Sequence, residues 1–171
     1  MCRFSFDKAF DKVWHEGLIF KLKQNGIRGN LLHILNAFLN DISQRVVLNG
    51  KESSWKSIYS GIRQGSVLGP LLFLIYINDL AENISPNIKL FADDSSLFIK
   101  VTDVNTAHNL LMSDLQHITT WAHQWKMKFG PDITKQAIEV IFSCKLKKLN
   151  HPLLDFNGIL LPDVKTPNIW A

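Results

Sequence analysis

Two adjacent carboxylates, Asp93 and Asp94, stand between two apolar runs of the chain, residues 88–92 and 95–99. These runs predict two short buried strands joined by an acidic turn. Neighbouring carboxylates in an apolar setting repel each other, and a divalent cation such as Mg²⁺, which prefers carboxylate and water oxygens, removes that repulsion. Aspartate is also a favoured residue of ordinary turns. The pair by itself therefore leaves open a metal-binding turn and a plain hairpin turn.

A second acidic segment follows the start of the chain. Asp7 and Asp11 come directly after residues 2–6, which predict a short strand, and they are mixed with aromatic and basic residues. A carboxylate at the end of a strand is another place to hold a metal ion, and a solvated charged loop is the alternative.

Glycines recur at every fourth position in Gly61, Gly65 and Gly69. A glycine removes a side chain where another backbone or a ligand must come close, although glycines also serve plain turns. Gln64 lies between two of them, so its amide is placed to hydrogen-bond something outside the chain. A surface glutamine satisfied within the protein is the alternative.

Hydrophobic periodicity and turn signals predict the elements that must position these residues. Helices are expected over residues 16–25, 30–40, 70–80 and 106–126. Strands are expected over residues 2–6, 43–48, 54–59, 88–99 (as the acidic hairpin), 137–142 and 153–156. The Asn49-Gly50 dipeptide favours a tight hairpin between the second and third of these strands. This order predicts an α+β domain with a mainly antiparallel sheet and helices packed on one face.

The composition suits one domain, since 46% of the 171 residues are hydrophobic. The formal net charge of +4 permits a polyanionic partner without requiring one. The two cysteines show no metal-ligand spacing, and no apolar signal segment is present, so we expect an intracellular protein, in the nucleus or the cytoplasm. The longest apolar stretch, residues 67–77, is too short to span a bilayer, and no membrane partner is expected.

Four segments, in this order, resemble the reverse transcriptases of non-LTR (LINE-type, jockey-like) retrotransposons. The segment K-A-F-D-K-V-W-H-E-G-L at residues 8–18 looks like the first palm motif of that family. The segment Q-G-S-V-L-G-P-L-L-F at residues 64–73, with Y-I-N-D-L at residues 76–80, is similar to the second. F-A-D-D at residues 91–94 resembles the metal-binding hairpin, and residues 121–142 resemble the fourth motif with its paired tryptophans. The resemblance covers about residues 4–159.

The resemblance implies a reverse transcriptase palm that copies RNA into DNA by phosphoryl transfer with two metal ions, Mg²⁺ or Mn²⁺. It implies an RNA template, a DNA primer and a dNTP as ligands, and other parts of a polyprotein as possible partners. Asp93 and Asp94 would be catalytic metal ligands. The residues that would contact nucleotide or template are Phe10, which would check the sugar of the incoming nucleotide, Gln64, Gly65 and Lys135.

The departures from the family pattern concern the same site. The third metal carboxylate of the family falls at Ser5, and a neutral hydroxyl cannot replace it. Asp7 faces the same side of an extended strand about 6 to 7 Å away, so it is the candidate catalytic substitute. The usual proline is Arg63, and the usual lysine of the fourth motif is Ile133, which leaves Lys135 as the nearest base.

We therefore expect a partial palm-like domain over residues 1–161, with fingers and thumb largely missing, and a divergent tail over residues 162–171. The expected function is that of an RNA-directed DNA polymerase copy that is impaired or inactive, so the sequence leaves open whether the chain is an enzyme. An active subunit completed by another chain, a nucleic-acid-binding module without chemistry and a translated relic are the alternatives.

Overall fold

The computed structural model describes residues 1–40, 42–82, 84, 87–100, 103–130, 138–140 and 152–162. The chain divides into two compact units, one formed by Met1–Lys8 with Asp79–Ala171 and the other by Ala9–Asn78. We call them the sheet unit and the helical unit. The domain boundary expected after residue 161 lies at the edge of the described residues and stays a prediction.

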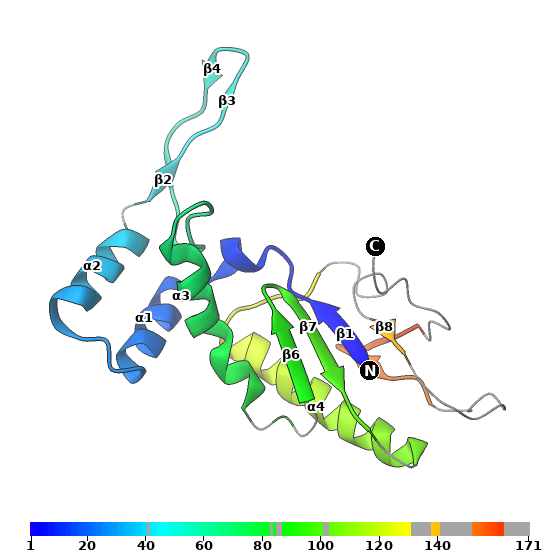
Figure 1. Cartoon of the computed structure of the whole chain (residues 1–171). Helices are drawn as coiled ribbons and strands as arrows, with labels where there is room; N and C mark the ends of the chain where they lie inside the picture. Colours follow the sequence, from blue (N-terminus) through cyan, green and yellow to red (C-terminus); the bar gives the residue numbers. More distant parts are fainter. Residues whose placement is uncertain are drawn as a thin grey trace. The chain divides into compact units, whose positions relative to one another are not determined.

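The sheet unit is built on a four-stranded sheet with the order β6-β7-β1-β8, and its strand pairs are antiparallel (Figure 1). The strands are β1 (Cys2–Ser5), β6 (Asn87–Phe91), β7 (Asp94–Phe98) and β8 (Ile138–Glu139). The register sets Ser5 opposite Asp94 and Cys2 opposite Leu97. Because successive side chains alternate between faces, Cys2, Phe4 and Leu97 share one face, while Ser5 and Asp94 share the other.

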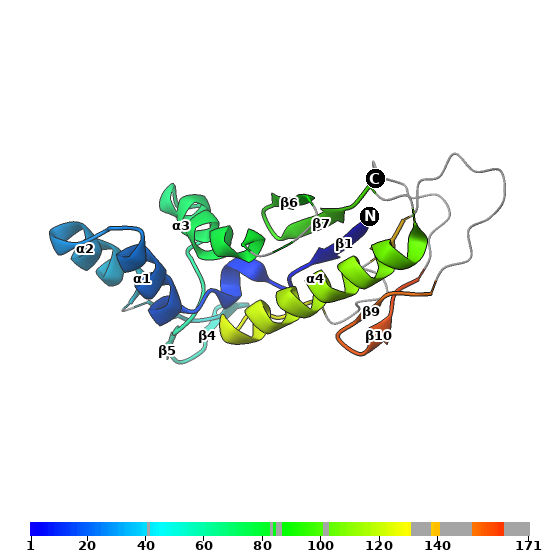
Figure 2. The ribbon, with the colours of Figure 1, turned by 90° about the horizontal axis from the view of Figure 1, so that it is seen from below.

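Helix α4 (Val104–Gln124) covers one face of this sheet (Figure 2). It begins two residues before the expected position because the Asp103 carboxylate accepts a hydrogen bond from the Thr106 backbone N–H at 2.8 Å and caps the helix. Its buried side chains, Leu111, Leu115 and Ile118, form the core of the unit with the buried face of the sheet. A helix packed on one face of an antiparallel sheet agrees with the predicted α+β class.

The acidic hairpin differs from its prediction. It forms, but its strands are not both buried: Phe91 is 82% exposed and Phe98 is 39% exposed. The reason is that β6 is an edge strand and that Phe91 and Phe98 lie on the same face as Asp94, opposite the face that α4 covers. Of the strand expected over residues 137–142, residues 138–139 pair with β1, residue 140 is described outside a strand, and the others lie outside the described residues.

The last predicted strand, residues 153–156, is shorter than expected. β9 (Asp155–Phe156) pairs with β10 (Ile159–Leu160), a strand that the sequence did not reveal. Asn157 and Gly158 both have positive φ and form the tight turn between them. Phe156 of β9 is buried against Phe4 and Phe129, with ring centroids 5.6 and 4.6 Å away. This hairpin therefore closes the aromatic end of the core.

The helical unit contains α1 (His15–Gln24), α2 (Gly29–Leu39) and α3 (Leu68–Ile77), with the 3-10 helix η1 (Ala9–Lys12) before them. A second 3-10 helix, η2 (Asn78–Ala81), follows α3. Helix α1 packs against both α2 and α3. Pro70 lies in the first turn of α3, as predicted, where its missing N–H has no helical partner to lose. None of the described helices is long and apolar enough to cross a membrane.

A long hairpin between α2 and α3 has the predicted Asn49-Gly50 turn, in which both residues have positive φ. Its strands differ from the prediction. β2 (Ser43–Gln44) pairs with β5 (Lys56–Ser57), and these lie within the expected ranges. β3 (Val47–Leu48) pairs with β4 (Lys51–Glu52), which lies before the strand expected over residues 54–59. Between these ladders the outgoing strand has two residues and the returning strand has three. The extra residue is a bulge, which interrupts the pairing.

Candidate metal and nucleotide site

The acidic turn is formed by Ala92 and Asp93, between the paired residues Phe91 and Asp94. Asp93 is exposed in the turn, and Asp94 is half-buried as the first residue of β7. Ala92 has a φ of 51°, a conformation that favours glycine and costs a residue with a Cβ about 1 kcal/mol. The Asp93 carbonyl accepts a hydrogen bond from the Phe6 backbone N–H at 3.1 Å. The turn is therefore held against the end of β1.

Strand β1 presents Arg3 and Ser5 to the two carboxylates. Arg3 Nη2 donates to Asp94 Oδ2 at 2.7 Å, and both side chains are partly exposed. Ser5 Oγ donates to Asp93 Oδ2 at 3.4 Å, a long hydrogen bond. Arg3 lies opposite Ser96, diagonally from Asp94 on the same open face of the sheet. Asp94 is thus paired with a guanidinium, and Asp93 accepts a hydrogen bond from a hydroxyl.

Asp7, the expected substitute for a third carboxylate, lies two residues beyond Ser5. Its backbone N–H donates to the Lys128 carbonyl at 2.8 Å, and the next residue, Lys8, has a φ of 48°. The chain therefore leaves the extended conformation just after Asp7. Its proposed catalytic role stays a prediction.

The described residues do not fit a centre for two metal ions. No group of three His, Cys, Asp or Glu side chains in the described ranges is placed to hold a metal. Asp93 and Asp94 supply oxygens of the kind that Mg²⁺ and Mn²⁺ prefer, but one oxygen of Asp94 is paired with Arg3. Asp93 and Asp94 are therefore two candidate ligands, one of which already pairs with a guanidinium.

The predicted nucleotide contacts Phe10, Gln64 and Gly65 lie in the helical unit. Phe10 stacks on Phe73 with ring centroids 4.4 Å apart, and Gln64 Nε2 donates to Asp11 Oδ1 at 2.9 Å. The Gln64 amide therefore has a partner within the chain, the second of the two alternatives left open by the sequence. Gly65 has positive φ, and a Cβ there would meet nothing within 4 Å. The role of Gly65 as a nucleotide contact stays a prediction.

Backbone contacts join the first motif to this glycine loop. Gly61 N–H donates to the Val13 carbonyl and Ile62 N–H to the Phe10 carbonyl, both at 2.8 Å. A Cβ at Gly61 would lie 2.8 Å from the Asp11 carbonyl oxygen, so glycine is required for this approach. Residues 9–18 of the first motif and residues 61–65 are thus neighbours within the helical unit. Lys135, the remaining predicted contact, lies outside the described residues.

Two further residues of the motifs acquire partners that the sequence did not indicate. Trp121 Nε1 donates to Asp79 Oδ1 at 2.9 Å, a contact within the sheet unit. Arg3 was not singled out either. Its signal was the alternation of residues 2–6, which sets Arg3 and Ser5 on one face of the strand.

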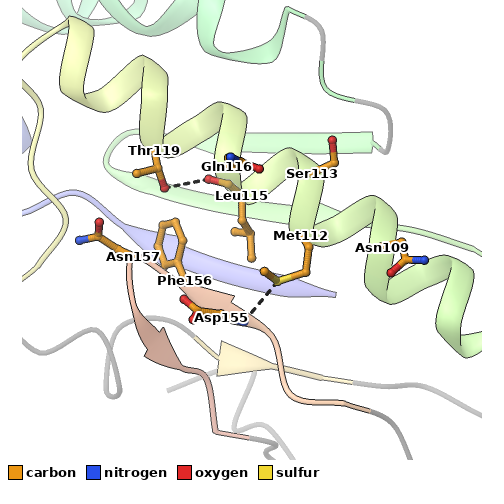
Figure 3. Close-up of a pocket in the computed structure, with 9 residues that line it drawn as sticks. All are labelled: Asn109, Met112, Ser113, Leu115, Gln116, Thr119, Asp155, Phe156 and Asn157. Carbon is orange, nitrogen blue, oxygen red and sulfur yellow. Dashed lines mark hydrogen bonds between the residues drawn. The ribbon is translucent and has the colours of Figure 1, made fainter.

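A pocket of about 470 Å³ lies between α4 and the β9–β10 hairpin (Figure 3). Figure 3 shows Phe156 and Leu115 beside each other, and the Met112 sulfur accepting a hydrogen bond from the Asp155 backbone N–H. A second pocket of about 580 Å³ is lined by Asp79, Trp121 and their neighbours. Neither pocket contains a residue that the sequence predicted to be catalytic.

Comparisons with known proteins support the sequence motifs. A family described as "Reverse transcriptase (RNA-dependent DNA polymerase)" matches residues 2–152. The chain is 31% identical over 168 residues to the RNA-directed DNA polymerase from mobile element jockey of Drosophila funebris, which covers 94% of this chain and 18% of that protein. It is 30% identical over 163 residues to the probable RNA-directed DNA polymerase from transposon BS of Drosophila melanogaster, which covers 90% of this chain and 17% of that protein.

This chain therefore belongs to the reverse transcriptase family. The predicted resemblance to the polymerases of non-LTR retrotransposons is confirmed. The jockey polymerase of Drosophila melanogaster is also 30% identical, over 133 residues that make up 73% of this chain and 14% of that protein. The chain thus spans less than a fifth of the length of these curated relatives.

Proposed function

We propose that this chain forms the palm part of an RNA-directed DNA polymerase of a retrotransposon, and that its metal site is impaired. Asp93 and Asp94 are the proposed ligands for Mg²⁺ or Mn²⁺, and Asp7 is the proposed substitute for the missing carboxylate. An RNA template, a DNA primer and a dNTP are the proposed ligands. Their proposed contacts are Phe10, Gln64, Gly65 and Lys135.

One observation carries the proposal of impairment. Ser5, the position at which the resemblance implies a carboxylate, lies directly opposite Asp94, and among the described residues the Arg3 guanidinium pairs with Asp94 at 2.7 Å. The Coulomb repulsion that would favour a metal ion is thus partly relieved by the protein itself. A cation that enters must displace Arg3 or share Asp94 with it.

Magnitudes separate the two effects. An exposed ion pair such as Arg3–Asp94 contributes about 0–1 kcal/mol, so it weakens metal binding only a few-fold. A missing carboxylate removes a ligand outright. Each 1.36 kcal/mol of lost transition-state stabilisation lowers the rate tenfold. We therefore propose that the serine at position 5 reduces activity more than the Arg3–Asp94 ion pair does.

The first test is Mn²⁺ binding, followed by the loss of the free-ion electron paramagnetic resonance signal. We expect the unmodified chain to bind weakly, Ser5→Asp to bind at least tenfold more tightly, and Arg3→Gln to bind a few-fold more tightly. Adding Asp93→Asn and Asp94→Asn to either the Ser5→Asp or the Arg3→Gln variant should abolish its increase in Mn²⁺ affinity.

Arg45→Gln, which removes an exposed arginine that pairs with Glu52, is the matched control and should leave Mn²⁺ binding unchanged. If Ser5→Asp binds no more tightly than the unmodified chain, residue 5 is not a ligand position and the proposed site is wrong.

A further inference from the structure

The β2–β5 hairpin, residues 43–57, stands clear of the helices of its own unit (Figure 1). All of its side chains are exposed, including those of Val46, Val47 and Leu48. Trp55 is 60% exposed, and Tyr59, just beyond the hairpin, is 81% exposed. Exposed apolar and aromatic side chains that lie together on one element are typical of an interaction site.

The charges of the hairpin are mostly positive. The segment contains three basic residues, Arg45, Lys51 and Lys56, and one acidic residue, Glu52. Its net charge is therefore +2 (3 − 1). Glu52 forms its ion pair with Arg45. Among the described residues, no carboxylate is recorded as an ion-pair partner of Lys51 or Lys56. The hairpin therefore suits a polyanionic partner better than a basic one.

Trp55 is held in place by its neighbours. The Arg45 guanidinium lies over its indole ring, 4.8 Å from the centroid, and Glu52 in turn holds Arg45. Gln44 pairs with Lys56 in the antiparallel ladder, so the next residues of the two strands, Arg45 and Trp55, lie side by side. An indole supported on one side and open on the other is a platform on which a base can stack, and a guanidinium plane extends that platform.

We propose that this hairpin binds single-stranded nucleic acid, with a base stacked on Trp55 and phosphates near Lys51 and Lys56. The identity of the partner rests on the proposed function, but the surface uses no residue of the acidic turn and requires no metal. Aromatic stacking with scattered lysines favours an unpaired strand over a duplex, because bases within a duplex are already stacked.

The test is fluorescence anisotropy of a labelled 12-nucleotide single strand, RNA or DNA, titrated with the full chain in EDTA over a series of salt concentrations. We expect Trp55→Ala to weaken binding about tenfold and Trp55→Phe to retain most of the affinity. Lys51→Gln combined with Lys56→Gln should lower the slope of log K against log salt by about 1.4, since each lost phosphate contact with a single strand lowers it by about 0.7.

Two matched controls come from the same unit. Lys23→Gln removes an exposed lysine of α1, and Leu31→Ala trims an exposed apolar residue of α2. Both should leave the affinity and the salt slope unchanged. Circular dichroism of every variant should match that of the unmodified chain, since each change lies at an exposed position.

Absence of binding at low salt, equal affinity of Trp55→Ala and the unmodified chain, or preference for a duplex would overturn the proposal. Concentration-dependent dimerisation that Trp55→Ala abolishes, without oligonucleotide binding, would assign the surface to a second copy and also overturn it. Because EDTA removes metal, failure of the proposed polymerase site in the Mn²⁺ test leaves this result standing.

Discussion

The two carboxylates of the acidic turn have different surroundings. Asp93 is exposed and is reached by Ser5 Oγ at 3.4 Å, whereas Asp94 is half-buried and paired with Arg3 at 2.7 Å. Asp93 is thus the more accessible of the two to an incoming cation. The charge of Asp94 is already balanced by Arg3. We therefore predict that substitutions at Ser5 and Arg3, and not in the turn itself, tighten Mn²⁺ binding.

Cys2 illustrates a residue-scale effect of burial. Burial raises the pKa of the Cys2 thiol to about 12 from its ordinary 9.0, while the nearby amino terminus lowers it and Glu139 raises it further. The folded state therefore favours the neutral thiol. The resulting stability is fully present below pH 9 and is lost as the pH rises from about 9 to about 12, because the unfolded chain ionises first.

We predict that Cys2 reacts with a thiol reagent about 1,000-fold more slowly in the folded chain than in urea at pH 8, because the thiolate is the reactive form. The measurement uses a Cys144→Ser background, which leaves Cys2 as the sole thiol of the chain. Similar rates in folded and unfolded protein would show that the thiol is not protected by burial.

At the scale of elements, α1 and α3 are joined by an unusual lysine. Lys21 is 3% exposed, its Nζ donates to the Tyr76 carbonyl in the last turn of α3, and it lies 4.9 Å from the Tyr76 ring centroid. A cation near the carboxyl end of a helix interacts favourably with the exposed carbonyls there. Lys21 therefore stabilises the last turn of α3.

We predict that Lys21→Ala lowers the free energy of unfolding by about 2–4 kcal/mol, because it removes a charged hydrogen bond and the packing of a buried stem. Lys21→Met keeps the stem and should cost about 1–3 kcal/mol. Lys23→Ala, an exposed neighbour on the same helix, should stay within about 0.5 kcal/mol. Urea unfolding measures all three, and equal midpoints for Lys21→Ala and Lys23→Ala would refute the role of Lys21.

The whole chain spans 14–18% of the length of its curated relatives, so the activity of those proteins belongs to it only as a proposal. Its contacts form two units, and the proposed metal ligands lie in the sheet unit, while Phe10, Gln64 and Gly65 lie in the helical unit. Because residues with proposed roles fall in both units, catalysis is to be measured on the full chain.

We predict that the full chain extends a DNA primer on an RNA template, with Mg²⁺ or Mn²⁺, no faster than its Asp93→Ala variant. A metal site that lacks one carboxylate forfeits tenfold in rate for each 1.36 kcal/mol of lost stabilisation. Extension tenfold above the Asp93→Ala control would contradict the proposed impairment. If Asp7→Ala abolished that extension, Asp7 would be the substitute carboxylate.

The sequence by itself determined the described helices, the order of most strands, the acidic turn and the family. These follow from local patterns, such as the spacing of apolar residues in α4 and the Asn49-Gly50 turn. They also follow from sequence motifs, which can be recognised without knowledge of tertiary contacts. The helix and turn predictions succeeded because propensity and periodicity act over a few residues.

The tertiary structure alone decided what surrounds those residues. Arg3 and Asp94 are 91 residues apart in sequence, and only the β1–β7 register brings them together. The buried face of α1 includes Lys21, while the apolar Ile19 of the same helix stays half-exposed. Such outcomes depend on which surfaces pack together, and a long-range pairing leaves no signal in the local pattern of either partner.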